Sequence, residues 1–435
     1  MKKVHLVEVG SVEAESQRLA LPEQVQLAMF EIAESAKEGL LALAVGAGLA
    51  VLQECMEYEV DRVVGAKGRH DHERTAKRHG RVGGEVTLGG RRVPISRPRV
   101  RSADDSAEVA LASYAEFASR DLLERVALER MLARVSTRRY ERAGDPVGAQ
   151  VEAASRSTSR SAISRAFVNG TRAALDELLA RDLSGLELAI VMIDGIELAG
   201  MTHVVALGIT TDGTKVPLSL REGSTENATV ATALLADLCE RGLRLHEQQL
   251  FVLDGAKALR KAVRDVAGAR APVQRCQRHK ERNVLDHLPD RERPWVRAKL
   301  RKAWSEPDHV HALAALRALE RAVERSHPDA AGSLREGLEE TLTLTRLGVS
   351  GALKRTLRST NPIESMIGTV RDTQHNVKRW RSGDMRMRWT AAGLAEAQRS
   401  FRRVKGHRDI PKLSAAIRHQ QNPSPTKEAA ALIAA

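Results

Sequence analysis

The amino-acid sequence predicts an α/β protein in which a mixed β-sheet follows a mainly helical N-terminal region. Residues 186–275 contain five short apolar runs, separated by turn residues and by two helical stretches, a pattern typical of a mixed sheet with covering helices. Residues 22–64 and 119–181 instead carry apolar positions at helical spacing. The chain has 435 residues, more than one typical domain, so we expect several domains.

The composition is strongly basic. The chain has 69 Lys and Arg against 56 Asp and Glu, which favours a polyanionic partner, nucleic acid before an acidic membrane. Aromatic residues make up 3%, too few to bind single strands on aromatic platforms. Three cysteines exclude a disulfide scaffold and favour a reducing compartment. The longest apolar run, at 40–52, is shorter than the roughly 20 residues that span a bilayer. We therefore expect a soluble cytoplasmic protein with no membrane partner.

A helical N-terminal region is predicted at 1–65, followed by a basic β-hairpin or linker at 66–105. Residues 67–101 hold 11 Lys or Arg against three acidic residues. Apolar and polar residues alternate sufficiently in residues 84–88 and 91–100 to predict two short strands joined by a glycine turn. This segment would lie along a duplex backbone; the alternative is a solvated linker.

Residues 106–182 are predicted to form a helix-turn-helix-like DNA-binding domain. Helices are expected at Asp121–Val135 and Ser136–Arg142, and after a turn-rich gap Ser159 or Ser161 would cap another helix. One face of this last helix carries Ile163, Phe167 and Leu175. Elsewhere it carries side chains suited to a major groove, namely Arg160, Ser164, Arg165 and Asn169. An ordinary helical hairpin is the alternative.

The sheet region occupies residues 183–282. Its strands are expected at 186–194, 202–210, 214–220, 248–254 and 272–275, and its helices at 227–241 and 256–266. Helical residues 283–350 interrupt this α/β unit, which resumes at 351–410 with a helix beginning at Asn361. We expect a disordered tail at 411–435.

Three carboxylates stand at chemically suggestive positions in the α/β unit. Asp194 and Asp254 each end a predicted strand, and Glu364 lies in the first turn of a later helix. The first and fourth strands of such a sheet are neighbours, so these groups can converge and bind two Mg²⁺ or Mn²⁺ ions through oxygen ligands. The alternative readings are Asp-Gly turns for the aspartates and a capping arrangement with Asn361 for the glutamate.

Several sequence strings resemble the Mutator-type transposases of bacterial insertion sequences. These strings are VMIDGIELAG, GSTENATVATALLADLCERGL, FVLDGAKALRKAV, CQRHKERNVLDHLP and STNPIESMIGTVR. The resemblance covers residues 185–405 and extends over 70–180, whereas the first 65 residues fit the family pattern least well. It implies DDE chemistry on an RNase H-like catalytic core in two parts, 183–282 and 351–410, separated by an α-helical insertion.

The resemblance also implies roles for individual residues. Asp194 and Asp254 match the catalytic aspartates and Glu364 the glutamate, while Cys276 and His279 match the family's C-x-x-H motif. That motif would line the active site or contact DNA near the cleaved end. Two alternatives remain for it: a packed cysteine beside a histidine at a helix start, and a zinc site, which would need a second ligand pair that the sequence lacks.

A basic segment follows the glutamate. Residues 365–408 hold 11 Lys or Arg against three acidic residues. The candidates for contacts with DNA phosphates are Arg371, Lys378, Arg379 and Arg381, with Arg386 and Arg388 nearby. The alternative is a solvated helical face whose tryptophans turn towards the core.

The resemblance implies hydrolysis at the 3′ ends of an insertion sequence, followed by strand transfer into other DNA. The expected partners are double-stranded DNA, both the terminal inverted repeats and the target, and a second copy of the chain in a homodimer. The expected location is the bacterial cytoplasm, in association with the nucleoid. Two other functions stay open: a sequence-specific DNA-binding regulator derived from an inactive transposase, and a nuclease of the RNase H superfamily.

Overall fold

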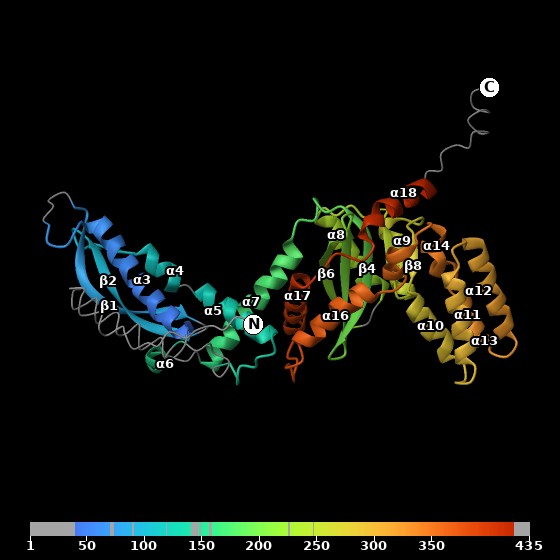
Figure 1. Cartoon of the computed structure of the whole chain (residues 1–435), viewed down its shortest axis with the longest axis horizontal. Helices are drawn as coiled ribbons and strands as arrows, with labels where there is room; N and C mark the ends of the chain where they lie inside the picture. The colour runs from blue at the N-terminus through green and yellow to red at the C-terminus, as the bar shows by residue number, and fades with distance from the viewer. Residues whose placement is uncertain are drawn as a thin grey trace, which may run out of the picture. The chain divides into compact units, whose positions relative to one another are not determined.

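The computed structural model describes residues 40–69, 74–88, 91–118, 120–140, 147, 149–155, 159–224, 227–246 and 248–421. The chain divides into two compact units (Figure 1). The first comprises the described residues up to Arg130 and those of 135–167, and the second comprises 131–134 and the residues from Val168 onwards.

The first unit contains the predicted basic hairpin. Strands β1 (Ala76–Leu88) and β2 (Arg91–Ser102) pair antiparallel, and the short β3 (Glu108–Val109) extends the sheet. Helix α3 (Leu40–Val64) packs against the strands through a shared apolar cluster (Figure 1). Because this hairpin has its own core, the solvated-linker reading is wrong. Gly89 and Gly90, where we predicted the turn, lie outside the described residues.

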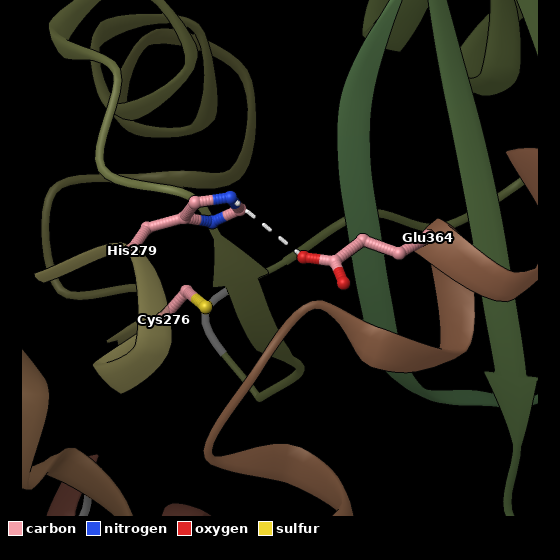
Figure 2. Close-up of side chains that lie close together, drawn as sticks. All are labelled: Cys276, His279 and Glu364. Atoms are coloured by element: carbon pink, nitrogen blue, oxygen red, sulfur yellow. Dashed lines mark ion pairs between the residues drawn. The ribbon is translucent and has the colours of Figure 1, made fainter. Parts of the chain in front are cut away.

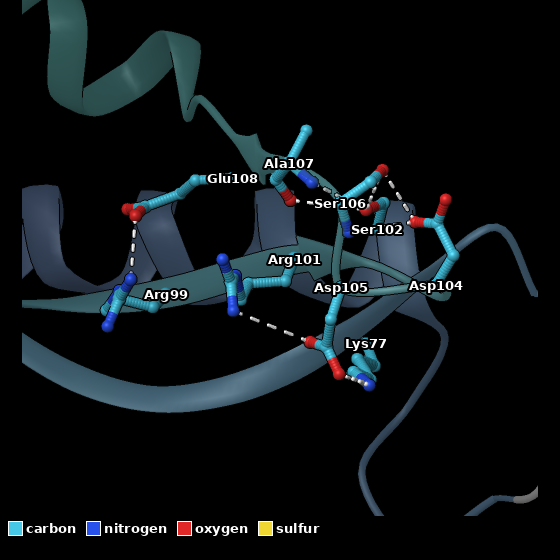
Figure 3. A network of polar contacts seen from close by, with 9 residues as sticks. All are labelled: Lys77, Arg99, Arg101, Ser102, Asp104, Asp105, Ser106, Ala107 and Glu108. Atoms are coloured by element: carbon cyan, nitrogen blue, oxygen red, sulfur yellow. Dashed lines mark hydrogen bonds and ion pairs between the residues drawn. The ribbon is translucent and has the colours of Figure 1, made fainter.

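Many hairpin arginines form ion pairs within this unit. Arg78 pairs with Asp61 and Arg81 with Glu57, both acids of α3. Beyond β2, the side chain of Asp105 pairs with Lys77, and Arg99 donates to Glu108 at 2.9 Å (Figure 3). These pairs reduce the positive charge that the hairpin can present to a phosphate backbone.

The remaining helices of the first unit partly match the prediction. They are α4 (Ala112–Ala118), α5 (Arg120–Leu132), α6 (Ala149–Ala154) and the start of α7 (Arg160–Ala180). Ser159 Oγ accepts from Ala162 N at 3.2 Å, which confirms the predicted cap. Ile163 packs with Ala127 and Tyr140. The helix expected at Ser136–Arg142 is wrong, because residues 137–140 form turns.

The second unit is built on a five-stranded mixed sheet in the order β6-β5-β4-β7-β8. Its strands are β4 (Leu188–Leu198), β5 (Met201–Thr210), β6 (Lys215–Gly223), β7 (Leu250–Leu253) and β8 (Val273–Arg275). The first three strands form the predicted antiparallel meander, and β7 runs parallel to β4. The α/β class and the adjacency of the first and fourth strands are therefore confirmed.

Alternate residues of β4 supply two apolar cores, one on each face of the sheet. Ile190 and Met192 belong to the core that includes residues of α16 (Asn361–Thr373), α17 (Gly383–Arg399) and α18 (Ile410–Gln421). Val191 and Ile193 belong to the core shared with α8 (Ala228–Glu240) and α9 (Lys257–Ala267). Successive side chains of a strand point to opposite faces, so a continuous apolar run indicates a central strand covered on both sides.

A helical insertion follows β8, as predicted, although its first helix begins before residue 283. It contains α10 (Gln277–Asp286), α11 (Arg293–Ser305), α12 (His309–Glu324), α13 (Pro328–Arg335), η2 (Glu339–Leu342) and α14 (Thr343–Arg346). These helices enclose a core of their own (Figure 1). Helix α15 (Gly351–Leu357) then leads to α16, and η3 (His407–Asp409) precedes α18.

The disordered tail predicted from residue 411 is wrong for residues 411–421. They belong to α18, whose Leu413 and Ile417 are buried in the core beside the sheet. Residues 422–435 lie outside the described residues. Within the described part of the chain, no helix is both long and apolar enough to cross a membrane.

Candidate active site

Asp194 lies inside β4 and does not end it. The strand continues to Leu198, with Asp194 paired to Val205 and Gly195 paired to Val204 of β5. The prediction that Asp194 ends a strand is therefore wrong, and so is the alternative of an Asp-Gly turn at this position. The parallel pairing with β7 does end here, because its last register partners are Ile193 and Leu253.

Asp254 follows directly after β7, as predicted. Its Oδ1 accepts from Ala256 N at 2.8 Å, so the carboxylate also stabilises the turn into α9. Gly255 has a φ of +115°, and a Cβ there would come within 2.3 Å of Arg275 Nε. Glycine is required because the turn needs this backbone conformation and leaves room for the guanidinium.

Two buried basic side chains hold the end of α13: Arg275, which lies against the Gly255 turn, and Lys280 of α10. Arg275 NH1 donates to Glu336 O at 2.8 Å, and Lys280 Nζ donates to the same carbonyl and to Ser333 O. Burial, together with the nearby positive charge of Arg275, lowers the pKa of Lys280 to about 7. The end of α13 is thereby held next to the loop that carries Asp254.

Glu364 projects from the first turn of α16. Thr360 is the N-cap residue, and its hydroxyl donates to Glu364 Oε1 at 2.7 Å. Asn361 is the first residue of the helix, and its side chain accepts from Arg278. The alternative in which Asn361 caps the helix over Glu364 is therefore wrong. The buried Thr360 hydroxyl fixes the orientation of the glutamate.

Cys276 and His279 lie beside Glu364 (Figure 2). His279 Nε2 is 3.7 Å from Glu364 Oε1. Thr360 Oγ1 lies 3.5 Å from Cys276 Sγ and 3.4 Å from His279 Nδ1, so one hydroxyl contacts all three side chains. Cys276 is buried and precedes α10 directly, which agrees with the packed-cysteine reading, but His279 is half-exposed and faces the glutamate. The motif thus adjoins the candidate catalytic carboxylate.

The hydrogen bonds in this cluster shift two pKa values in opposite directions. Burial raises the pKa of the Cys276 thiol, but hydrogen bonds with His279 and Thr360 outweigh burial and lower it overall. The hydrogen bond with Cys276 raises the pKa of His279, and the negative charges of Asp254 and Glu364 add to that effect. A protonated imidazole is therefore favoured next to the carboxylates.

Two other carboxylates act on Asp194. Burial raises the pKa of Asp194 to about 6, and the negative charges of Asp254 and Glu364 add to that rise, whereas the hydrogen bond from the Gly195 N–H and the charge of His279 oppose it. Among the described residues, Cys276, His279 and Glu364 form a group of three possible metal ligands whose ligand atoms lie within 4.8 Å of one another. Neither Asp194 nor Asp254 belongs to this group.

The predicted DNA-binding residues differ in whether their side chains are exposed or held in ion pairs within the protein. Those on α7, namely Arg160, Ser164, Arg165 and Asn169, are all exposed. Those after Glu364, namely Arg371, Lys378, Arg379 and Arg381, are exposed as well. Arg386 and Arg388 are not available, because Arg386 pairs with Glu222 and the nearly buried Arg388 pairs with Asp384. For these two, the phosphate-binding prediction is wrong.

Sequence reasoning missed Thr360 and Arg278, which both contact Glu364. Arg278 NH1 lies 3.8 Å from Glu364 Oε2 and is largely exposed. A signal for Thr360 was present, because threonine directly before an Asn-Pro helix start is a favoured N-cap. Arg278 stands between Cys276 and His279, and nothing in a single sequence distinguishes it from its basic neighbours.

The chain is similar in sequence to transposases of bacterial insertion sequences. The transposase of insertion sequence IS6120 from Mycolicibacterium smegmatis is 33% identical over 198 residues, which is 44% of this chain and 60% of the relative. The IST2 transposase of Acidithiobacillus ferrooxidans is 29% identical over 203 residues, 47% of this chain and 66% of the relative. The ISRM5 transposase of Rhizobium meliloti (strain 1021) is 28% identical over 333 residues, 75% of this chain and 81% of the relative.

The chain thus spans 60% and 66% of the first two of these relatives. The family model described as "Transposase, Mutator family" matches residues 19–403, which cover most of both units and every candidate site residue. This chain belongs to the Mutator family of transposases.

Proposed function

We propose that this chain is a DDE transposase that cleaves DNA at the ends of an insertion sequence and joins those ends to other DNA. The observation that carries the proposal is that Asp194 and Asp254 each stand one residue beyond the last register pair between the parallel strands β4 and β7. The charge of Glu364 also contributes to the raised pKa of Asp194. The family match and the names of the relatives support the same activity. The order of the strands and helices supports an RNase H-like fold for the core.

Asp194, Asp254 and Glu364 would hold two Mg²⁺ or Mn²⁺ ions, and their chemistry fits this role. They supply hard oxygen ligands, and burial, with a contribution from the charges of Asp254 and Glu364, raises the pKa of Asp194 to about 6, so a divalent cation would stabilise its ionised form. When bound, such ions supply an activated attacking oxygen and a stabilised leaving oxygen.

The reaction consists of two phosphoryl transfers. In the first, a water oxygen loses a proton and attacks phosphorus, the bond to the 3′ oxygen breaks, and that oxygen takes up a proton, which leaves a 3′-OH on the element and a 5′-phosphate on the flanking DNA. In the second, that 3′-OH loses its proton, attacks a phosphate of the target DNA and displaces a target 3′ oxygen, which takes up a proton. Both steps leave the protein covalently unchanged, so no Ser, Tyr or Cys nucleophile is needed.

Side chains around Glu364 would orient these steps. Thr360 holds the Glu364 carboxylate at 2.7 Å, and the exposed guanidinium of Arg278 stands where it can bind a phosphate oxygen. A protonated His279 would add positive charge on the same side. Double-stranded DNA, as terminal inverted repeats and as target, is the partner we propose. The two ends of the insertion sequence must be held together if both are to be joined to the target DNA, so we propose a homodimer as the active form.

The proposal is tested with Asp254→Asn. This change removes one metal-binding charge and should abolish Mg²⁺-dependent end cleavage while DNA affinity stays near the wild-type value. Asp265→Asn is a matched control, because Asp265 lies on α9 and pairs with Lys261 away from the sheet edge. Wild-type cleavage that persists in excess chelator would contradict the metal mechanism. DNA binding by wild-type protein without any cleavage would indicate a regulator instead.

A further inference from the structure

The helical insertion carries a basic cavity next to the candidate active site. Its volume is about 620 Å³, and it lies between α10 and α11. The arginines that line it are Arg278, Arg282, Arg293, Arg297, Arg301 and Arg358, whereas its acidic lining residues are Glu281 and Asp286. The lining is thus positively charged, and Leu285 and Trp304 are its large apolar members.

Several of these guanidinium groups are held in fixed positions. Glu281 accepts from Arg301 Nε at 2.8 Å and lies 3.3 Å from Arg297 Nε. Arg293 Nε donates to the carbonyls of Leu285 and Leu288, each at 3.0 Å. Ordered guanidinium groups lose less conformational entropy when they bind an anion than mobile surface arginines do.

Two other arginines carry positive charge that the protein does not neutralise. Arg282 and Arg358 are exposed, and neither forms an ion pair within the described part of the chain. They belong to segments far apart in the sequence, since Arg282 is on α10 and Arg358 follows α15. The two segments meet where Gln277 N donates to Arg358 O at 2.9 Å.

The cavity adjoins Glu364 through the side chain of Arg278. Arg278 lines it and also lies 3.8 Å from Glu364 Oε2. Arg358 stands two residues before Thr360, whose hydroxyl holds Glu364. A polyanion bound in the cavity would therefore extend directly to the reacting carboxylates.

We infer that this cavity binds the DNA backbone next to the scissile phosphate, and that it does so independently of base sequence. The inference rests on the proposed function and adds a second DNA-contacting surface, on the insertion, that sequence reasoning did not find. A guanidinium matches phosphate oxygens in two-point hydrogen bonds, and salt-dependent phosphate contacts fix position rather than sequence. Arg282 and Arg358 supply positive charge that is not taken up by an ion pair among the described residues.

The test uses the full-length chain carrying Arg282→Ala and Arg358→Ala together. Affinity for a random-sequence duplex is measured over a range of salt concentrations, and end cleavage is measured in parallel. Each phosphate contact contributes about 0.9 to the slope of log affinity against log salt, so the slope should flatten by roughly 1–2 units. Cleavage should also fall, because the scissile phosphate loses its position. Arg282→Lys with Arg358→Lys should restore most of the slope, since lysine also binds phosphate.

The matched control is Arg321→Ala with Arg325→Ala. Both arginines are exposed at the end of α12, and their loss removes the same charge from the same insertion. This control should keep the wild-type slope. Thermal unfolding of both double variants verifies that they fold.

Each result has a distinct meaning. An unchanged slope in the Arg282/Arg358 variant overturns the inference, even where the wild-type protein cleaves normally and the proposed function stands. Equal flattening in the control also overturns it, because the effect would then reflect net charge alone. A flattened slope confined to the Arg282/Arg358 variant, together with a wild-type protein that never cleaves, supports the cavity as a DNA site and contradicts the proposed function.

Discussion

Asp194 and Asp254 occupy equivalent positions where the pairing between the neighbouring strands β4 and β7 ends. Each residue stands directly after one residue of the last register pair. That pair is Ile193 and Leu253, and the two strands run parallel. The parallel direction places both carboxylates at the same edge of the sheet. Their proximity, together with burial, explains the raised pKa of Asp194, and it leads to the first prediction.

The stabilisation of the protein by Mg²⁺ or Mn²⁺ should depend on pH. The pKa of Asp194 rises from 3.8 to about 6 on folding, so the folded protein binds more protons between these values. The metal-free protein therefore loses stability as pH rises through this window, by roughly 2–3 kcal/mol in total. Metal binding requires the ionised carboxylate, so the metal-induced increase in Tm should be small near pH 5 and complete above about pH 7.

Scanning calorimetry with and without Mn²⁺ at these pH values measures this effect. Asp194→Asn should make the metal-free protein more stable above pH 6, because it removes a buried charge, and should abolish most of the metal-induced increase. A wild-type increase of equal size at both pH values would rule out Asp194 as a ligand.

Arg386 should be required for stability rather than for DNA binding. It donates two hydrogen bonds to Glu222, at 2.7 and 3.0 Å, and Glu222 in turn contacts the buried His203 at 2.7 Å. Arg386→Ala leaves Glu222 without its guanidinium partner and should lower the free energy of unfolding by roughly 2–4 kcal/mol. Arg386→Lys should have an intermediate effect, because lysine keeps the charge but not the two-point geometry.

Denaturant unfolding checks the stability of these variants. The salt slope of DNA binding should stay at the wild-type value in Arg386→Ala, measured under conditions in which this variant remains folded, because the charge that it loses is already paired with Glu222. A reduced slope with normal stability would reinstate Arg386 as a phosphate contact.

The exposed residues Lys378 and Arg379 should contact DNA phosphates independently of sequence. Replacing both by alanine should flatten the slope of log affinity against log salt by about two units, to a similar extent on specific and random duplexes. Cleavage should fall further than binding, because a misplaced phosphate no longer meets the carboxylates. If these side chains only form a solvated face, salt titrations of the double variant will match the wild type.

The exposed arginines of α7 should contribute to sequence recognition. In the full-length chain, Arg160→Ala with Arg165→Ala should weaken binding to the terminal repeat by about 1–3 kcal/mol per lost base contact. Binding to a random duplex should weaken less. Arg321→Ala with Arg325→Ala is again the control for charge. Competition assays with the terminal repeat and the random duplex measure the ratio of the two affinities. Equal losses of affinity for both duplexes would mean that α7 contacts DNA without sequence specificity.

The sequence by itself determined the mixed sheet and which of its strands are central. The apolar runs at 186–194 and 248–254 are long enough to be central strands, and the turn Thr211-Asp212-Gly213 joins the strands expected at 202–210 and 214–220. Asn227 caps α8, as expected for a helix starting there. These features follow from local patterning, because side-chain alternation and turn chemistry act over a few residues.

Only the tertiary structure decided how far β4 extends and which basic residues remain available. The apolar run stops at Asp194, but pairing with β5 carries the strand on to Leu198. Arg379 and Arg386 belong to the same basic segment, yet Arg379 is exposed and Arg386 is paired with Glu222, which is 164 residues away. Thr360 likewise joins Cys276, His279 and Glu364 only once α10 and α16 are folded together. Such pairings depend on contacts between distant segments, and no local pattern encodes the distance between two side chains that far apart in the chain.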